Sequence, residues 1–179
     1  MKRHVLSGIL AATLAATGWS LGWTNNRIVN GGLLDCPNPS TMADAEEDQY
    51  VWKAPLEVGA DLPGFKVTRQ PIKLVWSKQT NRRWLELCDG GGVSQTVPVR
   101  AGRTYMFRFV LEGNPQGDEE QTVNVVVPGV TRSETVTRKE TRPIETRFTP
   151  NSDQAAIEVY ATEGGRGPRV RTFELEPIQ

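Results

Sequence analysis

The sequence predicts an all-β protein that folds as a two-sheet antiparallel β-sandwich. Short runs of alternating apolar and polar residues recur along the chain, and each run is typical of a strand with one buried and one wet face. Turn-forming residues separate the runs, with 17 Gly and 12 Pro among 179 residues. No amphipathic helix of ordinary length is visible after residue 20. The second layer that a one-faced sheet requires is therefore expected to be another sheet.

Residues 83–115 show this alternation most clearly and are expected to form three successive strands, over 84–88, 93–99 and 104–111. In the first of them Leu85 and Leu87 share one face, which is expected to be buried. That arrangement places Trp84 on the wet face. The opposite arrangement, with Trp84 in the sandwich and both leucines facing outward, stays open at this point.

The remaining strands are expected on either side of this stretch, over 27–33, 50–52, 65–68, 72–76, 121–127, 143–148, 155–160 and 169–175. In 155–160 the apolar residues Ala155, Ile157 and Val159 point inward. The charged segment 130–139 is expected to be an edge strand that is open to water on both faces. The acidic segment 42–49 is expected to be a solvated loop, with one or two helical turns as the alternative.

The charge balance excludes one class of partner. Lys+Arg and Asp+Glu both number 21, so no basic excess exists to neutralise nucleic-acid phosphates. We therefore expect no nucleic acid to bind.

The N-terminus has the layout of a secretory signal peptide. Lys2 and Arg3 precede an apolar run over residues 5–16, and small residues follow it. We expect a signal peptide over 1–20 and one β-sandwich domain over 21–179, with no membrane span after cleavage. The protein is then secreted, either extracellular or held in the cell envelope, with the periplasm as a further location. An uncleaved signal anchor is the alternative, although the run is barely long enough to span a bilayer.

Removal of the signal peptide also removes His4, the single histidine of the chain. The mature chain then lacks the imidazole that Ser-His-Asp or Cys-His catalysis and His-ligated zinc sites require. Two cysteines remain, Cys36 and Cys88, and an even pair in an exported chain predicts one disulfide. Two separate buried thiols are the alternative.

Five fragments, taken in order, resemble one known family. They are Asn30-Gly31-Gly32-Leu33-Leu34, Leu62-Pro63-Gly64-Phe65-Lys66-Val67, Leu85-Glu86-Leu87 with Val93-Ser94-Gln95-Thr96-Val97, Ala101-Gly102-Arg103-Thr104-Tyr105, and Leu111-Glu112-Gly113-Asn114-Pro115. The family is the secreted jelly-roll family catalogued as domain of unknown function 642, found in plant cell walls and many bacterial exported proteins. The resemblance implies a galactose-binding-like jelly roll and covers nearly all of residues 27–177.

The chain departs from that family at acidic positions that help to hold a structural calcium ion in many galactose-binding-like modules. Leu34 stands where the family has its opening Glu, and Val170-Arg171-Thr172 stands for its closing Leu-Asp-Asn. In segment 42–49 acids alternate, but the central Gly and distal Glu of a calcium loop are missing. We therefore expect no cofactor and no metal, with structural calcium as the open alternative.

These observations favour a secreted protein that binds a cell-wall or matrix glycan and is not an enzyme. The expected platform for a sugar ring is Trp84, with Trp52 and Trp76 next, and Arg83, Asn114 and Gln116 as partners of the hydroxyls. The alternative is a structural or protein-interaction domain at the cell surface that recognises another exported protein. The acids Glu86, Asp89, Glu112 and Asp118 are possible members of a glycosidase pair, but a rim of solvated acids is the favoured explanation for them.

Overall fold

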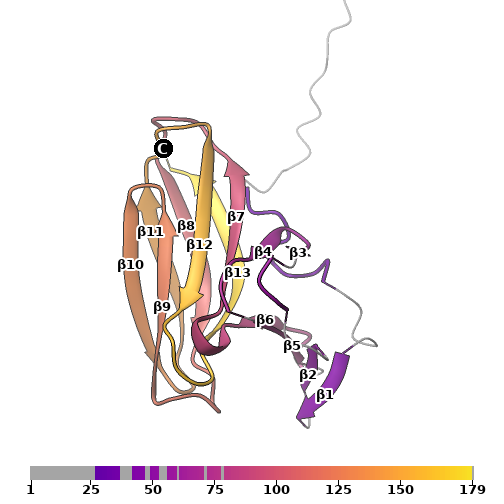
Figure 1. The fold of residues 1–179 in the computed structure, drawn as a ribbon. Coiled ribbons are helices and arrows are strands. Elements are labelled where there is room, and N and C mark those ends of the chain that lie inside the picture. Colours follow the sequence, from indigo (N-terminus) through magenta and orange to yellow (C-terminus); the bar gives the residue numbers. More distant parts are fainter. Residues whose placement is uncertain are drawn as a thin grey trace, which may run out of the picture.

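The computed structural model describes residues 27–36, 42–46, 49–52, 56–59, 61–70, 72–77 and 79–178. Two antiparallel sheets lie face to face (Figure 1), which confirms the predicted all-β sandwich. The predicted signal peptide falls outside the described residues. The division into a signal peptide and one domain stays a prediction.

The first sheet has seven strands. In spatial order they are β1 (Met42–Glu46), β2 (Gln49–Trp52), β5 (Lys73–Ser77), β6 (Arg83–Glu86), β13 (Arg169–Pro177), β8 (Tyr105–Glu112) and β11 (Thr141–Phe148). In Figure 1 the short strands β1, β2, β5 and β6 extend to one side of the long strands. A short 3₁₀ turn, Cys88–Gly90, follows β6.

The second sheet has six strands. In spatial order they are β10 (Val130–Thr137), β9 (Glu120–Val127), β12 (Gln154–Ala161), β7 (Gly92–Pro98), β4 (Phe65–Val67) and β3 (Asp61–Leu62). β10 is the edge strand that the sequence predicts. However, Glu134 and Val136 in it are buried, so the expectation of two wet faces is wrong.

The core lies between the sheets and is built from the alternation seen in the sequence. In β8 and β9 every second residue is buried, and the apolar and aromatic side chains among them are those of Tyr105, Phe107, Phe109, Leu111, Val123, Val125 and Val127. Phe173 of β13 joins the two layers. Its ring centroid lies 4.9 Å from that of Phe65 in the six-stranded sheet and 6.0 Å from that of Phe109 in its own. Tilted and offset aromatic pairs of this kind each stabilise a core by about 0.5–1.5 kcal/mol beyond their buried area.

Two expectations near the N-terminus are wrong. Residues 28–32 form turns rather than a strand, and Asn30 and Leu33 adopt positive φ angles of 52° and 58°, far from the extended backbone of a regular strand. Residues 42–46 form the strand β1, because they pair with β2 in an antiparallel ladder. Local composition predicts a loop there, whereas the pairing partner determines the strand.

Candidate functional site

The structure buries Trp84, so the expectation of a wet ring is wrong. Trp84 is only 5% exposed, and its indole Nε1 donates a hydrogen bond to Glu112 Oε2 at 3.0 Å. Leu85 on the other face of β6 is also buried. Both faces are covered because the neighbouring strand β13 places Arg169 beside the outward face. Its guanidinium carbon lies 6.0 Å from the indole centroid.

Arg83 and Asn114 hold loops in place. Arg83 Nη1 donates to the carbonyl oxygen of Leu33 at 2.8 Å and to that of Leu34. The Asn114 residue is fully buried, and its side-chain Nδ2 donates to the carbonyl oxygen of Gly167 at 3.4 Å. Both side chains are thus committed to contacts inside the protein.

Gln116 and Trp52 complete the predicted set. The Gln116 side chain is exposed on the loop after β8, and its backbone N–H donates to Asn114 Oδ1 at 3.1 Å. Trp52 is the last residue of β2, and its side chain lies outside the described residues. The structure therefore does not bring the predicted residues together on one open surface, and their role in binding stays a prediction.

The predicted disulfide is also wrong, because Cys36 and Cys88 are free thiols. Each has its own partner: Asn30 Nδ2 lies 3.7 Å from Cys36 Sγ, and the Cys88 thiol donates to Glu86 Oε1 at 3.3 Å. Burial raises the pKa of both thiols. Burial together with the adjacent Glu86 carboxylate raises the pKa of Cys88 to about 12. The even cysteine count indicated a pair without saying whether the two loops meet.

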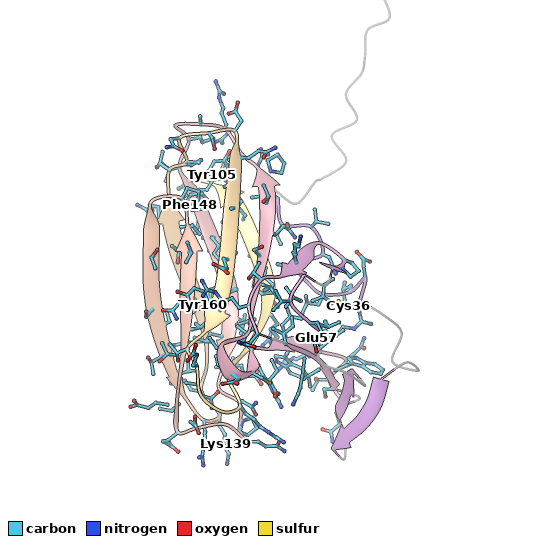
Figure 2. All side chains as sticks on the ribbon, viewed as in Figure 1. Cys36, Glu57, Tyr105, Lys139, Phe148 and Tyr160 are labelled. Atoms are coloured by element: carbon cyan, nitrogen blue, oxygen red, sulfur yellow. The ribbon has the colours of Figure 1, made fainter. Side chains whose placement is uncertain are left out.

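The outer face of the six-stranded sheet provides a different candidate. Its long strands point valines and alanines inward, so their alternate residues face away from the core. Those outward residues are mainly small and polar, namely Thr122, Asn124, Ser94, Thr96 and Ser133, with the half-buried Tyr160 of β12 among them. Figure 2 labels Tyr160 on this sheet. One aromatic ring in a polar, hydroxyl-rich face is an arrangement suited to a polar ligand with an apolar side.

Strand register places Tyr160 between Asn124 of β9 and Gly92 of β7. A Cβ atom at Gly92 would lie 2.6 Å from Tyr160 Cβ and 3.2 Å from Arg69 Cδ. A larger residue at this position would therefore displace one of these side chains. The glycine leaves the space in which the Arg69 guanidinium lies over the ring, with its central carbon 3.5 Å from the ring centroid.

Arg69 is fixed over Tyr160 by Glu158, the outward residue two places before Tyr160. Arg69 Nε and Nη2 donate to the two carboxylate oxygens of Glu158 at 3.1 and 3.3 Å, and Thr68 Oγ1 donates to the same carboxylate at 2.8 Å. A two-pronged bond of this kind fixes both the position and the plane of a guanidinium. The Arg69–Tyr160 stack is thus held in place without a ligand.

A hollow of about 550 Å³ opens beside this stack, within the size range of small-molecule sites. Its lining combines the stack with two amides, one hydroxyl and one carboxylate. The residues are Val58, Arg69, Gln70, Gly90, Asn124, Tyr160, Ala161, Thr162 and Glu163. A second hollow of about 650 Å³ lies over β4 and β7, lined by residues 62–66 and 94–96. Ser94 pairs with Glu158 and Lys66 in register, so the two hollows are neighbours on one sheet.

The sequence contained a signal for part of this site. The inward assignment of Ala155, Ile157 and Val159 leaves Tyr160 outward, and the same reasoning applied to 121–127 leaves Asn124 outward. Arg69 and Gln70 had no such signal, because they follow the short strand β4 and only the fold brings them to Tyr160.

The residues do not fit the structural calcium ion that the family resemblance raises. Leu34 offers no carboxylate, and Arg171 places a cation 3.7 Å from Glu112. Across the described residues, no three His, Cys, Asp or Glu side chains are grouped in a way that would hold a metal. The same part of the chain contains no helix that is long and apolar enough to cross a membrane.

No family model and no curated protein matches the chain. The fold does match solved structures. A CBM4 carbohydrate-binding module has a TM-score of 0.50 and 15% identity, over 84% of this chain and 99% of the module. The CBM22-1 xylan-binding domain of Paenibacillus barcinonensis Xyn10C has a TM-score of 0.50 and 13% identity, over 70% and 92%. Another CBM 22 xylan-binding domain has a TM-score of 0.50 and 14% identity, over 70% and 94%. The chain has the β-sandwich fold of these modules.

Proposed function

We propose that this protein is a non-catalytic carbohydrate-binding module that holds a glycan on the outer face of its six-stranded sheet. The observation that carries the proposal is the Arg69–Tyr160 stack beside a hollow with amide, hydroxyl and carboxylate groups. The likeness to carbohydrate-binding modules supports the fold on which this reading depends.

A sugar ring has an apolar face of C–H bonds and a rim of hydroxyl groups, and the hollow offers a partner for each. The Arg69–Tyr160 stack provides the surface for the C–H face. The amides of Gln70 and Asn124 can donate and accept hydrogen bonds, and the Glu163 carboxylate accepts them. Sugar hydroxyls therefore find partners both as donors and as acceptors. Orientation by a few polar groups around an apolar contact is what small-molecule sites generally use.

The stack is ordered before binding, which favours affinity. The Arg69 side chain is 43% exposed, yet two hydrogen bonds to Glu158 fix it. Immobilising a rotamer-rich side chain on binding costs about 0.5–1.5 kcal/mol. The Glu158 contact removes that cost from the binding step.

The neighbouring hollow supports an extended ligand. Together the two hollows follow the sheet from β12 to β4, over Tyr160, Ser94 and Lys66. A polysaccharide segment occupies such a surface better than a single sugar does. We propose a cell-wall or matrix glycan as the ligand and, from the N-terminal layout, export as the route by which the protein reaches it.

The arrangement of acids supports binding rather than hydrolysis. Glycoside hydrolysis uses two carboxylates on either side of the scissile bond. Glu163 lines the hollow, while the Glu158 carboxylate is held by Arg69 and Thr68. The Glu158 carboxylate therefore orients the Arg69–Tyr160 stack instead of acting on a substrate.

The test is an affinity screen of the purified protein on xylan, mixed-linkage β-glucan, galactan and arabinogalactan, with Tyr160→Ala and Tyr160→Phe alongside. We expect one glycan class to bind and Tyr160→Ala to weaken it about tenfold or more, since a buried aromatic surface contributes about 1.5–3 kcal/mol. Tyr160→Phe keeps the ring and serves as the matched control, with affinity within about threefold of the parent. A folded parent that binds no glycan, or a Tyr160→Ala variant with unchanged affinity, would overturn the proposal and favour a protein-interaction module.

A further inference from the structure

A third hollow lies on the opposite side of the molecule, on the seven-stranded sheet. It has a volume of about 330 Å³ and forms where β6 meets the end of β8 and the turn between β10 and β11. The buried Trp84 and the half-buried Glu112 contribute to its lining, together with three cations, Arg82, Lys139 and Arg169. Figure 2 places Lys139 at the end of the molecule where that turn lies.

Two of these charged groups are already compensated. Arg169 Nε lies 3.2 Å from Glu86 Oε2, and both side chains are buried. Glu112 accepts the indole hydrogen bond of Trp84 and lies 3.7 Å from Arg171 Nε. The carboxylates near the hollow are therefore engaged by groups other than Arg82 and Lys139.

Arg82 and Lys139 are not compensated. Within the part of the chain that the structure describes, neither side chain makes an ion pair, and both are exposed. The nearby Glu140 carboxylate accepts from the Thr137 backbone N–H at 3.0 Å and pairs with Arg142 at 3.4 Å. The hollow thus has two unpaired positive charges in its lining, with which an anionic group can pair.

Lys139 is held in position by its turn. Its φ angle is 65°, a left-handed conformation, and the Glu140 backbone N–H closes the turn by donating to Thr137 O at 3.1 Å. A non-glycine residue in this region costs free energy, which persists where the surroundings impose it and is concentrated at binding sites. The turn therefore fixes where the Lys139 side chain leaves the backbone.

We propose that this hollow binds a saccharide unit that carries a carboxylate or a sulfate. The anionic group would pair with Arg82 and Lys139, while the hydroxyls would meet the Ser77 and Thr80 side chains in the same lining. The Trp84 indole supplies an apolar wall for the ring. The volume lies at the lower end of the range for small-molecule sites, so one sugar unit fits rather than a chain.

This site is separate from the hollow beside the Arg69–Tyr160 stack, here called the Tyr160 hollow, because the two lie on different sheets. In the Tyr160 hollow the charge of Arg69 is compensated by Glu158 and the lining also has the Glu163 carboxylate, so an anionic sugar is not favoured there. The hollow beside Trp84 has two unpaired cations and favours an anionic sugar. The inference therefore does not depend on the function proposed for the six-stranded sheet, and a Tyr160→Ala variant should leave it unchanged.

The test is a ¹⁵N NMR titration that follows the Trp84 indole N–H, assigned with a Trp84→Phe variant. The probes are glucuronic acid, glucose 6-sulfate, glucose and inorganic sulfate. We expect saturable shifts with the first two probes, with dissociation constants in the millimolar range, and weaker or absent shifts with glucose. An Arg82→Gln/Lys139→Gln double variant should bind glucuronic acid at least tenfold more weakly than the parent.

The matched control is Arg100→Gln/Arg103→Gln, which removes two exposed cations from the turn at the opposite end of β8. It should bind glucuronic acid as the parent does, which separates a local site from the effect of net charge. Equal shifts with glucose and glucuronic acid, equal loss in both double variants, or saturation by inorganic sulfate alone would each overturn the proposal. Loss of glycan binding in Tyr160→Ala with this titration unchanged would concern only the other site.

Discussion

The buried ion pair between Glu86 and Arg169 gives a sharp prediction about stability. The two residues are 4% and 3% exposed, and Arg169 Nε lies 3.2 Å from Glu86 Oε2. Glu86 also accepts from the Cys88 thiol at 3.3 Å, and Lys73 Nζ lies 4.0 Å away. The carboxylate therefore neutralises the one charge that β13 buries beside Trp84.

Substitution of Glu86→Gln keeps the shape of the side chain but removes its charge. Arg169 then stays buried but loses the carboxylate of Glu86, and removing one partner of a buried pair costs about 3–5 kcal/mol. Because the amide oxygen can still accept a hydrogen bond, we expect the lower end of that range, about 3 kcal/mol. For a chain of this length such a loss lowers Tm by about 6–12 °C.

The assay is urea and thermal unfolding of the purified protein, with Glu145→Gln as the matched control. Glu145 lies 2.9 Å from Arg108 Nε, but its side chain is 54% exposed, so that pair is worth about 0–1 kcal/mol. A double variant, Glu86→Leu/Arg169→Met, should recover most of the loss, because apolar residues can replace a buried pair at little cost. If Glu86→Gln destabilises no more than Glu145→Gln does, the reasoning from burial fails.

Two further predictions concern the thiols and the close approach of two backbones. Stability should fall as pH rises from about 9 toward 12, because the unfolded Cys88 thiol ionises near its ordinary pKa of about 8.5 while the folded thiol, with a pKa of about 12, stays protonated. Urea unfolding of the parent and Cys88→Ala across this range checks the claim, and an equally steep fall in both would contradict it. The second prediction is that Gly167→Ala lowers the free energy of unfolding by at least about 1–3 kcal/mol, since the added Cβ would lie 1.9 Å from Leu87 O. Gly32→Ala, whose nearest contact would be 3.5 Å, should stay within about 0.5 kcal/mol of the parent, and equal Tm values for the two variants would refute this.

The sequence was sufficient to predict the sandwich where one face of a strand is apolar and the other polar. β8, β9 and β12 follow the expected alternation residue by residue, including the inward Phe107 and Val125. Alternation fails at β6, where Leu85 and Trp84 are both buried, because the rule assumes that one face is open to water. The Arg169 side chain that covers the outer face comes from a strand more than eighty positions away.

The same limit explains the errors at the predicted site. Asn114 is a reasonable partner for a hydroxyl by residue type, but its amide and backbone hold the loop against Gln121 and Gly167. The Tyr160 ring was predictable as outward, whereas its value as a platform depends on Arg69 and Gly92. These lie far from it along the chain, and the register of β12 with β7 brings Gly92 beside it. Local patterns give the direction of a side chain, and only the fold gives its neighbours.

The most direct test of the proposed glycan face is a ¹⁵N NMR titration of the purified protein with xylohexaose and cellohexaose. If the Tyr160 hollow holds a glycan, saturable shifts will cluster at Gln70, Asn124, Tyr160 and Thr162 on the six-stranded sheet, and Tyr160→Ala will abolish them while the other signals remain those of a folded protein. Saturable shifts that cluster instead on the outer face of the seven-stranded sheet, or that persist unchanged in Tyr160→Ala, would contradict the account.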